Sequence, residues 1–158
     1  MRAYSNIMMD KEKFLKKVDI TQKKTTEIRG SIVNATIQIE ILIDAILINY
    51  FILPKKHESF LRNLLCDKAC SSFLKLNALK SSGLLDGTSI KNNLDDLFEI
   101  RNKAAHYLPV LSLEEPLILH PKKEPIDLDK LNKEFIQKYD KIKPVLKEIL
   151  VKLIEEKK

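Results

Sequence analysis

The longest apolar stretch of the chain reads IVNATIQIEILIDAILINYFIL, residues 32–53, and Pro54 follows it directly. At about 100° per residue, its aliphatic side chains leave almost no face of a helix wholly polar, which is typical of a helix at the centre of a fold. Proline cannot continue a helix, and upstream Asp19 and Gln22 resemble a capping pair. We therefore predict one helix from about Thr21 to the end of this stretch.

The same stretch is long enough to cross a lipid bilayer, but polar residues interrupt it. They are Asn34, Gln38, Glu40, Asp44 and Asn49. Because polar and ionisable groups are costly in hydrocarbon, a buried helix of a soluble protein fits the pattern better. The first residues also lack the apolar run of a secretory signal, so we expect a cytoplasmic protein with no membrane partner.

The composition favours helices over sheets. The chain has 158 residues, of which 44% are hydrophobic and 32% charged, enough for one domain with its own core. It holds only three glycines and six prolines, whereas sheet-rich folds need a tight turn every few residues. We therefore expect an all-α fold, a four- to five-helix up-down bundle, in a single domain over residues 1–158 with its core at about 21–108.

Two further helical regions follow the central stretch. The pattern of residues 57–82 predicts one broken helix or two short ones. This helical region should end before Gly83, because glycine suits a helix C-cap. Another helix opens near Thr88 and runs to about Tyr107. In the first of these regions, the residues expected to face inward are Phe60, Leu64, Phe73, Leu76 and Leu79.

In the last third of the chain, a segment with a weak secondary-structure pattern is followed by one with a strong helical pattern. Residues 110–120 fit either a short β-hairpin, with a turn at Glu114–Pro116, or an ordered loop. Over residues 127–157 apolar residues recur every three or four positions, which predicts an amphipathic helix with a kink at Pro144.

The net charge of +6 lies at the two ends of the chain. Residues 1–30 hold 8 basic and 4 acidic side chains, residues 122–158 hold 11 and 8, and residues 31–121 hold 9 and 10. Such flanks are typical of a surface that attracts the phosphates of nucleic acid, and equally of a lysine-rich, solvated helix surface.

One arginine lies where an apolar residue is expected. In the helix that opens near Thr88, Arg101 projects from the middle of an apolar stripe and should be at least partly buried. A guanidinium cannot lose its charge by a pKa shift, so it needs a carboxylate, backbone carbonyls or a ligand phosphate. Glu40 and Asp44 on the central helix are the candidate partners. The stripe consists of Ile90, Leu94, Leu97, Phe98, Ala104, Ala105 and Leu108.

The segment around this arginine reads RNKAAH, residues 101–106. It resembles the R-x4-H motif of the HEPN superfamily in its RN-x-x-A-H form. The long upstream helix with Glu40 and Asp44 among aliphatic residues is similar to the central helix of that family. The layout of residues 25–108 is closest to the branch that contains the mannitol-operon repressor.

The resemblance implies an all-α bundle that dimerises so that two motifs face each other. Many members are metal-independent endoribonucleases of toxin–antitoxin or antiphage systems, which would make Arg101 and His106 catalytic and Asn102 their polar neighbour. Other members are regulators, partner-binding or ligand-binding modules without that activity. The expected partners are therefore a second copy of the chain, RNA, and an antitoxin or other protein.

The chemistry of such a site can be stated from the residues alone. Metal-free RNA cleavage needs a base for the 2′-hydroxyl, an acid for the leaving 5′-oxygen, and a cation for the charged phosphorus centre. Pairing about a two-fold axis would bring two copies of His106 and two of Arg101 to one cleft. Unpaired RNA would be the preferred substrate.

The sequence leaves a competing hypothesis open. In it, Arg101 is a structural ion paired with Glu40, His106 simply ends a helix, and the chain is a non-catalytic regulatory or dimerisation module. No cofactor is expected, because no glycine-rich phosphate loop is present. No metal site is expected either, because Cys66 and Cys70 lack a second pair of ligands.

Overall fold

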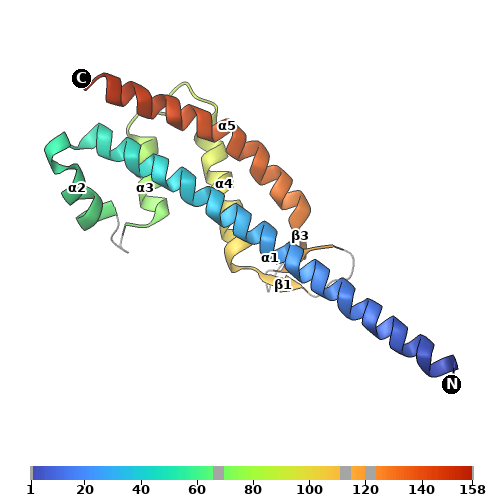
Figure 1. Ribbon diagram of the computed structural model, residues 1–158. Coiled ribbons are helices and arrows are strands. Elements are labelled where there is room, and N and C mark those ends of the chain that lie inside the picture. The colour runs from blue at the N-terminus through green and yellow to red at the C-terminus, as the bar shows by residue number, and fades with distance from the viewer. Residues whose placement is uncertain (1, 66–69, 111–114, 120–123, 158) are drawn as a thin grey trace. The chain divides into compact units, whose positions relative to one another are not determined.

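The computed structural model describes residues 2–65, 70–110, 115–119 and 124–157. Within these ranges the chain is mostly helical, and the expected all-α class is confirmed (Figure 1). The α-helices are α1 (Arg2–Phe51), α2 (His57–Phe60), α3 (Ser72–Ser81), α4 (Ile90–His106) and α5 (Leu128–Glu155). A 3-10 turn (Pro54–Lys56) and a π turn (Leu61–Leu65) flank α2, and the strands are β1 (Leu108–Val110), β2 (Leu117–Leu119) and β3 (Ile126–Asp127).

The central helix ends where the sequence predicts and begins much earlier. α1 stops at Phe51, ahead of Pro54, but it starts at Arg2 rather than near Thr21. The prediction that Asp19 caps a helix start was wrong. Residues 2–20 contain no proline or glycine, so nothing in the local chain forces the backbone out of the helical conformation before Asp19.

One part of α1 has the length and composition of a membrane span. It lies within Lys11–Phe51, and 39% of its most apolar window is buried inside the structure. The core helix of a soluble protein has the same property, so this finding is weak evidence on location.

The described chain divides into two compact units that share helices. Unit 1 comprises residues 1–34 and 99–135, and unit 2 comprises residues 35–98 and 136–158. α1, α4 and α5 each pass from one unit into the other. The R-x4-H motif lies wholly within unit 1.

The core of unit 2 is built from aliphatic faces of four helices. α3 begins at the N-cap Ser71 and ends before Gly83, whose φ of 79° is the left-handed conformation expected of a C-cap residue. Leu76 and Leu79 are buried as expected, but Phe73 is 68% exposed, so its predicted inward orientation was wrong. Other buried residues of this unit are Ile39, Ile43, Ile46, Leu94, Leu97, Ile142 and Leu146.

The polar contacts between α3 and α1 explain why Phe73 points outward. The side chains of Ser72 and Lys75 bind Glu40 and Asp44 on α1, so the face of α3 toward α1 is partly polar at this end. Of the remaining inward residues predicted in this region, Phe60 is half-buried, and the side chain of Leu64 lies outside the described part of the chain.

Unit 1 holds a small antiparallel sheet in the order β1-β2-β3. Leu108–Val110 and Leu117–Leu119 pair antiparallel, with Pro109 opposite Ile118, so these segments are the two strands of a hairpin rather than parts of an ordered loop. The third strand, β3, was not predicted, and Glu114 of the predicted turn lies outside the described residues. Ile118 in the central strand is fully buried, which makes the sheet part of the core of this unit.

The C-terminal helix matches its sequence pattern. The Oδ1 atom of Asp127 accepts hydrogen bonds from the backbone N–H groups of Asp129 (2.9 Å) and Lys130 (3.2 Å), so Asp127 acts as the N-cap of α5. The helix continues as one element through Pro144. Its buried residues are Leu128, Leu131, Phe135, Ile142, Leu146 and Leu153.

Candidate functional site

The R-x4-H motif occupies the last two turns of α4. The predicted apolar stripe of this helix is buried over most of its length, from Ile90 to Ala104. Ala105 is half-buried, and Leu108 is 64% exposed because it belongs to β1 rather than to the helix. The buried stripe therefore holds α4 in place up to the point where the motif begins.

Arg101 is half-buried, as its position in the stripe predicts. Its Nη1 atom donates a hydrogen bond to Oδ1 of Asn102, 3.0 Å away. Asn102 itself is exposed, so the pair lies where the core meets solvent. A guanidinium at such a boundary can approach an anion without being fully desolvated beforehand.

His106 is the last residue of α4 and is exposed to solvent. Successive residues of a helix rise about 1.5 Å, so His106 is about 7.5 Å along the axis from Arg101. Both side chains come from the part of α4 that lies in unit 1.

The structure adds a residue that the sequence did not reveal, Arg29 of α1. Its Nε donates to the backbone oxygen of Ala104 (2.5 Å), and its Nη2 donates to that of Ala105 (3.0 Å). These carbonyls belong to the last turn of α4, where the helix leaves acceptors unsatisfied. Arg29 thus fixes the end of the helix that carries His106, as a cation at the negative end of the helix dipole.

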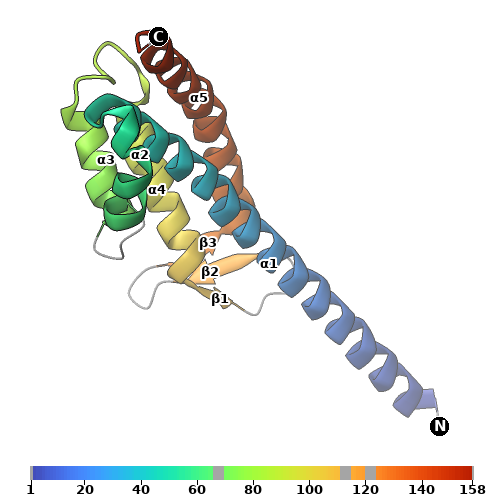
Figure 2. The ribbon, with the colours of Figure 1, turned by 60° about the vertical axis from the view of Figure 1, so that its left-hand side comes forward.

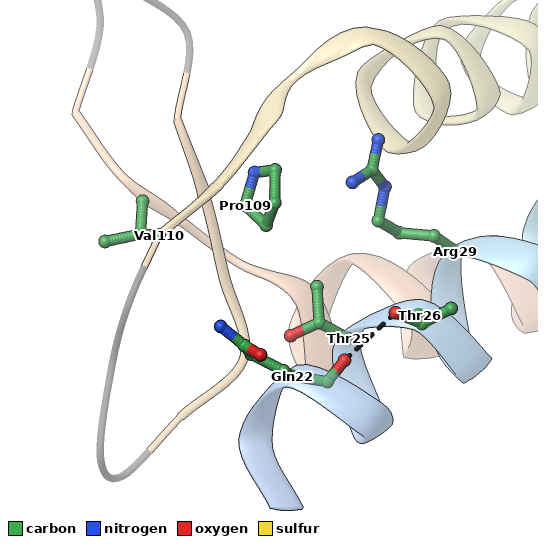
Figure 3. A pocket seen from close by; sticks show the side chains of 6 residues that line it. All are labelled: Gln22, Thr25, Thr26, Arg29, Pro109 and Val110. Carbon is green, nitrogen blue, oxygen red and sulfur yellow. Dashed lines mark hydrogen bonds between the residues drawn. The ribbon is translucent and has the colours of Figure 1, made fainter. Parts of the chain in front are cut away.

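A pocket of about 250 Å³ adjoins this contact (Figure 3). α1 contributes one wall and β1 the other, and Arg29 points from α1 toward the end of α4. Figure 2 shows the strands beside this end of α4. The residues that line the pocket are Gln22, Thr25, Thr26, Arg29, Pro109 and Val110.

A second hollow, of about 390 Å³, lies along the same contact. It shares Thr26 and Arg29 with the first pocket, and Ala104 and Ala105 form its other wall. The small alanine side chains leave room beside Arg29. Arg29 therefore lines two adjacent hollows next to the segment that carries Arg101 and His106.

One sequence pattern could have identified Arg29 as a functional residue. Thr25, Arg29 and Ile32 follow one another at intervals of four and three residues, so they lie on one face of α1. Thr25 and Ile32 are buried, and an arginine between buried residues must have partners. The partners are 75 and 76 residues away in sequence, and no local pattern identifies them.

The two acidic residues predicted to support the site lie in unit 2 and have partners on α3. Oε1 of Glu40 accepts a hydrogen bond from the Ser72 hydroxyl (2.6 Å), and Oδ2 of Asp44 is 2.8 Å from Nζ of Lys75. Burial raises the pKa of Asp44 from its ordinary 3.8, against the lowering effect of Lys75. Their role as counter-charges for Arg101 stays a prediction.

The remaining candidates for chemistry belong to unit 2 or lie outside the described residues. Cys70 is half-buried and unbonded, and Cys66 and His120 lie outside the described residues. Nε2 of His57 lies 3.0 Å from the backbone oxygen of Ile52. Among the described residues, no group of three or more His, Cys, Asp or Glu side chains could hold a metal ion.

Comparison of the sequence with protein-family models, with curated proteins and with solved structures finds no match. The motif and the geometry around it are therefore the observations that bear on function.

Proposed function

We propose that this protein is a HEPN-type, metal-independent endoribonuclease that cleaves single-stranded RNA with Arg101 and His106. One observation carries the proposal. A half-buried guanidinium and a solvent-exposed imidazole are five residues apart on one helix, and the end of that helix is fixed by Arg29. In a homodimer, a reacting phosphate could meet these groups from the two chains at a boundary between core and solvent.

Each residue has a distinct part in the proposed reaction. His106 removes the proton of the 2′-hydroxyl, and the oxygen then attacks the neighbouring phosphorus. The guanidinium of Arg101 stabilises the negative charge that builds up on the phosphoryl oxygens. Asn102 accepts a hydrogen bond from Arg101 and so orients the guanidinium. The 5′-oxygen leaves with a proton supplied by an acid.

One chain offers one histidine in this segment, whereas the reaction needs a base and an acid. A two-fold axis passing near the ends of two α4 helices would supply the second imidazole from a partner copy. The proposed active species is therefore a homodimer, in which one His106 acts as base and the other as acid.

The charge of unit 1 fits a polyanionic substrate. Lys11, Lys13, Lys16 and Lys17 on α1 are all exposed, with only one acidic residue, Glu12, among them. Such a lysine cluster attracts RNA through its phosphates and carries no sequence information of its own.

The activity test uses purified protein and a single-stranded RNA in excess EDTA. We expect cleavage by the wild type, a loss of at least about a hundredfold in His106→Ala, since general acid–base catalysis contributes about that much or more, and a similar loss in Arg101→Ala. His57→Ala is the matched control, because it removes a histidine from unit 2, and it should cleave like the wild type.

Two results would favour the other hypothesis. If the folded wild type leaves RNA intact with or without EDTA, the chain is better explained as a non-catalytic regulatory or dimerisation module. If another protein co-purifies with it and the chain still leaves RNA intact once freed of that protein, the partner defines the module. Cleavage that persists unchanged in His106→Ala would contradict the assignment of the site directly.

A further inference from the structure

We propose that the pocket between α1 and β1 binds one unpaired nucleobase of the RNA, and that it favours a base with an exocyclic amino group. This inference rests on the proposed ribonuclease function and adds a sequence preference to it. The pocket lies within unit 1 beside the last turn of α4, and Arg29 links the two. A base held there would be close to the phosphate that the 2′-oxygen attacks beside His106.

The hydrogen-bonding groups of the pocket are rich in acceptors. The hydroxyl of Thr25 donates to the backbone oxygen of Thr21 (2.8 Å), and that of Thr26 donates to the backbone oxygen of Gln22 (3.1 Å). Each hydroxyl has a single proton, so both oxygens have only lone pairs left for a ligand. Acceptors of this kind bind amino groups.

The same groups argue against a phosphate in the pocket. A phosphate needs donors, but both threonine protons are already engaged. Arg29 directs two of its nitrogens to the carbonyls of Ala104 and Ala105, and the partial negative charge of that helix end offsets part of its positive charge. The charge of the pocket is therefore weaker than a free arginine would make it.

Gln22 is the residue that reads the base. It lies one helical turn from Thr25 and Thr26, and its side chain lines the pocket (Figure 3). A glutamine amide offers a donor and an acceptor side by side, which match the amino group and ring nitrogen of adenine. Cytosine presents the same pair of groups, whereas uracil has no amino group for the threonine oxygens.

The size and apolar lining of the pocket suit a single base. A volume of about 250 Å³ lies below the usual range for drug-sized ligands, which begins at about 300 Å³. Pro109 and Val110 on β1 provide an apolar wall for the face of a base, opposite the polar wall from α1. Sequence-specific proteins commonly recognise RNA through such splayed, unpaired bases.

The test measures binding separately from cleavage. His106→Ala protein, which keeps the RNA intact, is titrated into fluorescently labelled 12-mers of sequence (UUA)4, (UUC)4 and U12, and Kd is read from anisotropy. We expect the A- and C-containing strands to bind about tenfold more tightly than U12, as one well-placed amide–base pair provides.

A second substitution in the same protein identifies the reading residue. Gln22→Ala should reduce the difference between the three strands to less than about twofold. Gln22→Glu, which only accepts hydrogen bonds, should bind all strands more weakly but keep its preference for (UUC)4 over U12. Gln137→Ala is the matched control, an exposed glutamine on the part of α5 in unit 2, and should keep the tenfold preference.

The outcomes separate the two proposals. Equal affinity for the three strands, or a tenfold preference that Gln22→Ala leaves undiminished, overturns the base pocket even if the wild type cleaves RNA in EDTA. A preference lost in Gln22→Ala supports the pocket even if the wild type cleaves nothing, in which case only the ribonuclease proposal fails.

Discussion

A half-buried arginine keeps its charge at every accessible pH, so its partners decide what it does. Arg29 donates to two backbone carbonyls at the end of α4, whereas Arg101 donates to the side chain of Asn102. A carbonyl at a helix end is fixed by the backbone, and an exposed amide can reorient. Arg29 is therefore suited to hold structure, and Arg101 is suited to exchange its partner for a phosphate.

Arg29→Ala should lower the free energy of unfolding by about 1–3 kcal/mol, because the carbonyls of Ala104 and Ala105 lose a charged donor. Urea denaturation monitored by circular dichroism measures this change. Arg62→Ala is the control: Arg62 forms an exposed pair with Glu58, and its loss should cost less than about 1 kcal/mol. Equal stability of the two variants would contradict the role of Arg29.

The burial of Asp44 predicts how the free energy of unfolding depends on pH. Burial raises its pKa above 3.8, so the folded state holds this proton more tightly than the unfolded state does. The wild type should therefore lose stability relative to Asp44→Asn as the pH rises from 3.8 through the raised pKa. Above that range the difference in unfolding free energy between the two proteins should be constant. It then also includes the free energy that Asp44→Asn loses with the Lys75 ion pair.

Urea titrations of both proteins across this pH range measure the difference in unfolding free energy. Glu148→Gln is the control, because its carboxyl is fully exposed and its pKa is lowered by Lys152, so any change runs in the opposite direction with pH. A difference between wild type and Asp44→Asn that stays flat across the range would contradict the burial effect.

The residues of the motif could be predicted from the sequence, but their neighbours could not. Arg101 stands out because it interrupts an apolar stripe at helical spacing, and it is half-buried as expected. Arg29 and Gln22 line the pocket together with β1 residues that are far away in the sequence. Only the fold brings these residues together. The contacts of Glu40 and Asp44 with Ser72 and Lys75 on α3 were not predicted for a related reason, since the fold creates them.

Proline and glycine predicted the ends of helices better than capping residues predicted their starts. Pro54 and Gly83 mark the ends of α1 and α3 correctly, because they act on the backbone whatever surrounds them. Asp19 can cap a helix only where the backbone is already leaving it, so its side chain alone gave the wrong start for α1. The two residues of β3 carry too little pattern to predict a strand.

The N-terminal half of α1 is the element expected to contact the RNA backbone. Replacing Lys11, Lys13, Lys16 and Lys17 by glutamine should weaken binding to all single-stranded sequences alike. It should also reduce the slope of log K against log[salt] by up to about 3, since each phosphate contact on a single strand adds about 0.7. Anisotropy titrations at several salt concentrations measure the slope.

The control for this prediction carries the same change of charge elsewhere. Glutamine substitutions at the exposed Lys55, Lys56, Lys141 and Lys147 of unit 2 should leave the slope close to that of the wild type. If both sets lower the slope equally, the RNA is attracted by the net charge of +6 and has no defined path along α1.

At the scale of the whole molecule, the proposed chemistry depends on pairing two chains. A single chain places one imidazole and one guanidinium at the end of α4, and the reaction needs two proton-transfer groups. The Arg29 contact and the hairpin hold that end in a defined position within unit 1. The pattern of the sequence predicts the all-α class correctly, but a symmetric cleft is a property of two chains that no single-chain pattern contains.

In the proposed reaction His106 activates a 2′-hydroxyl without a metal, so a substrate that lacks this hydroxyl should resist cleavage. Wild type and His106→Ala are incubated in EDTA with one single-stranded RNA and with the same strand carrying 2′-deoxyriboses throughout. We predict that the wild type cuts the RNA, leaving a 2′,3′-cyclic phosphate, and spares the deoxy strand, while the variant cuts neither. Cleavage of both strands by the wild type, or of neither by a folded dimer, would contradict the account.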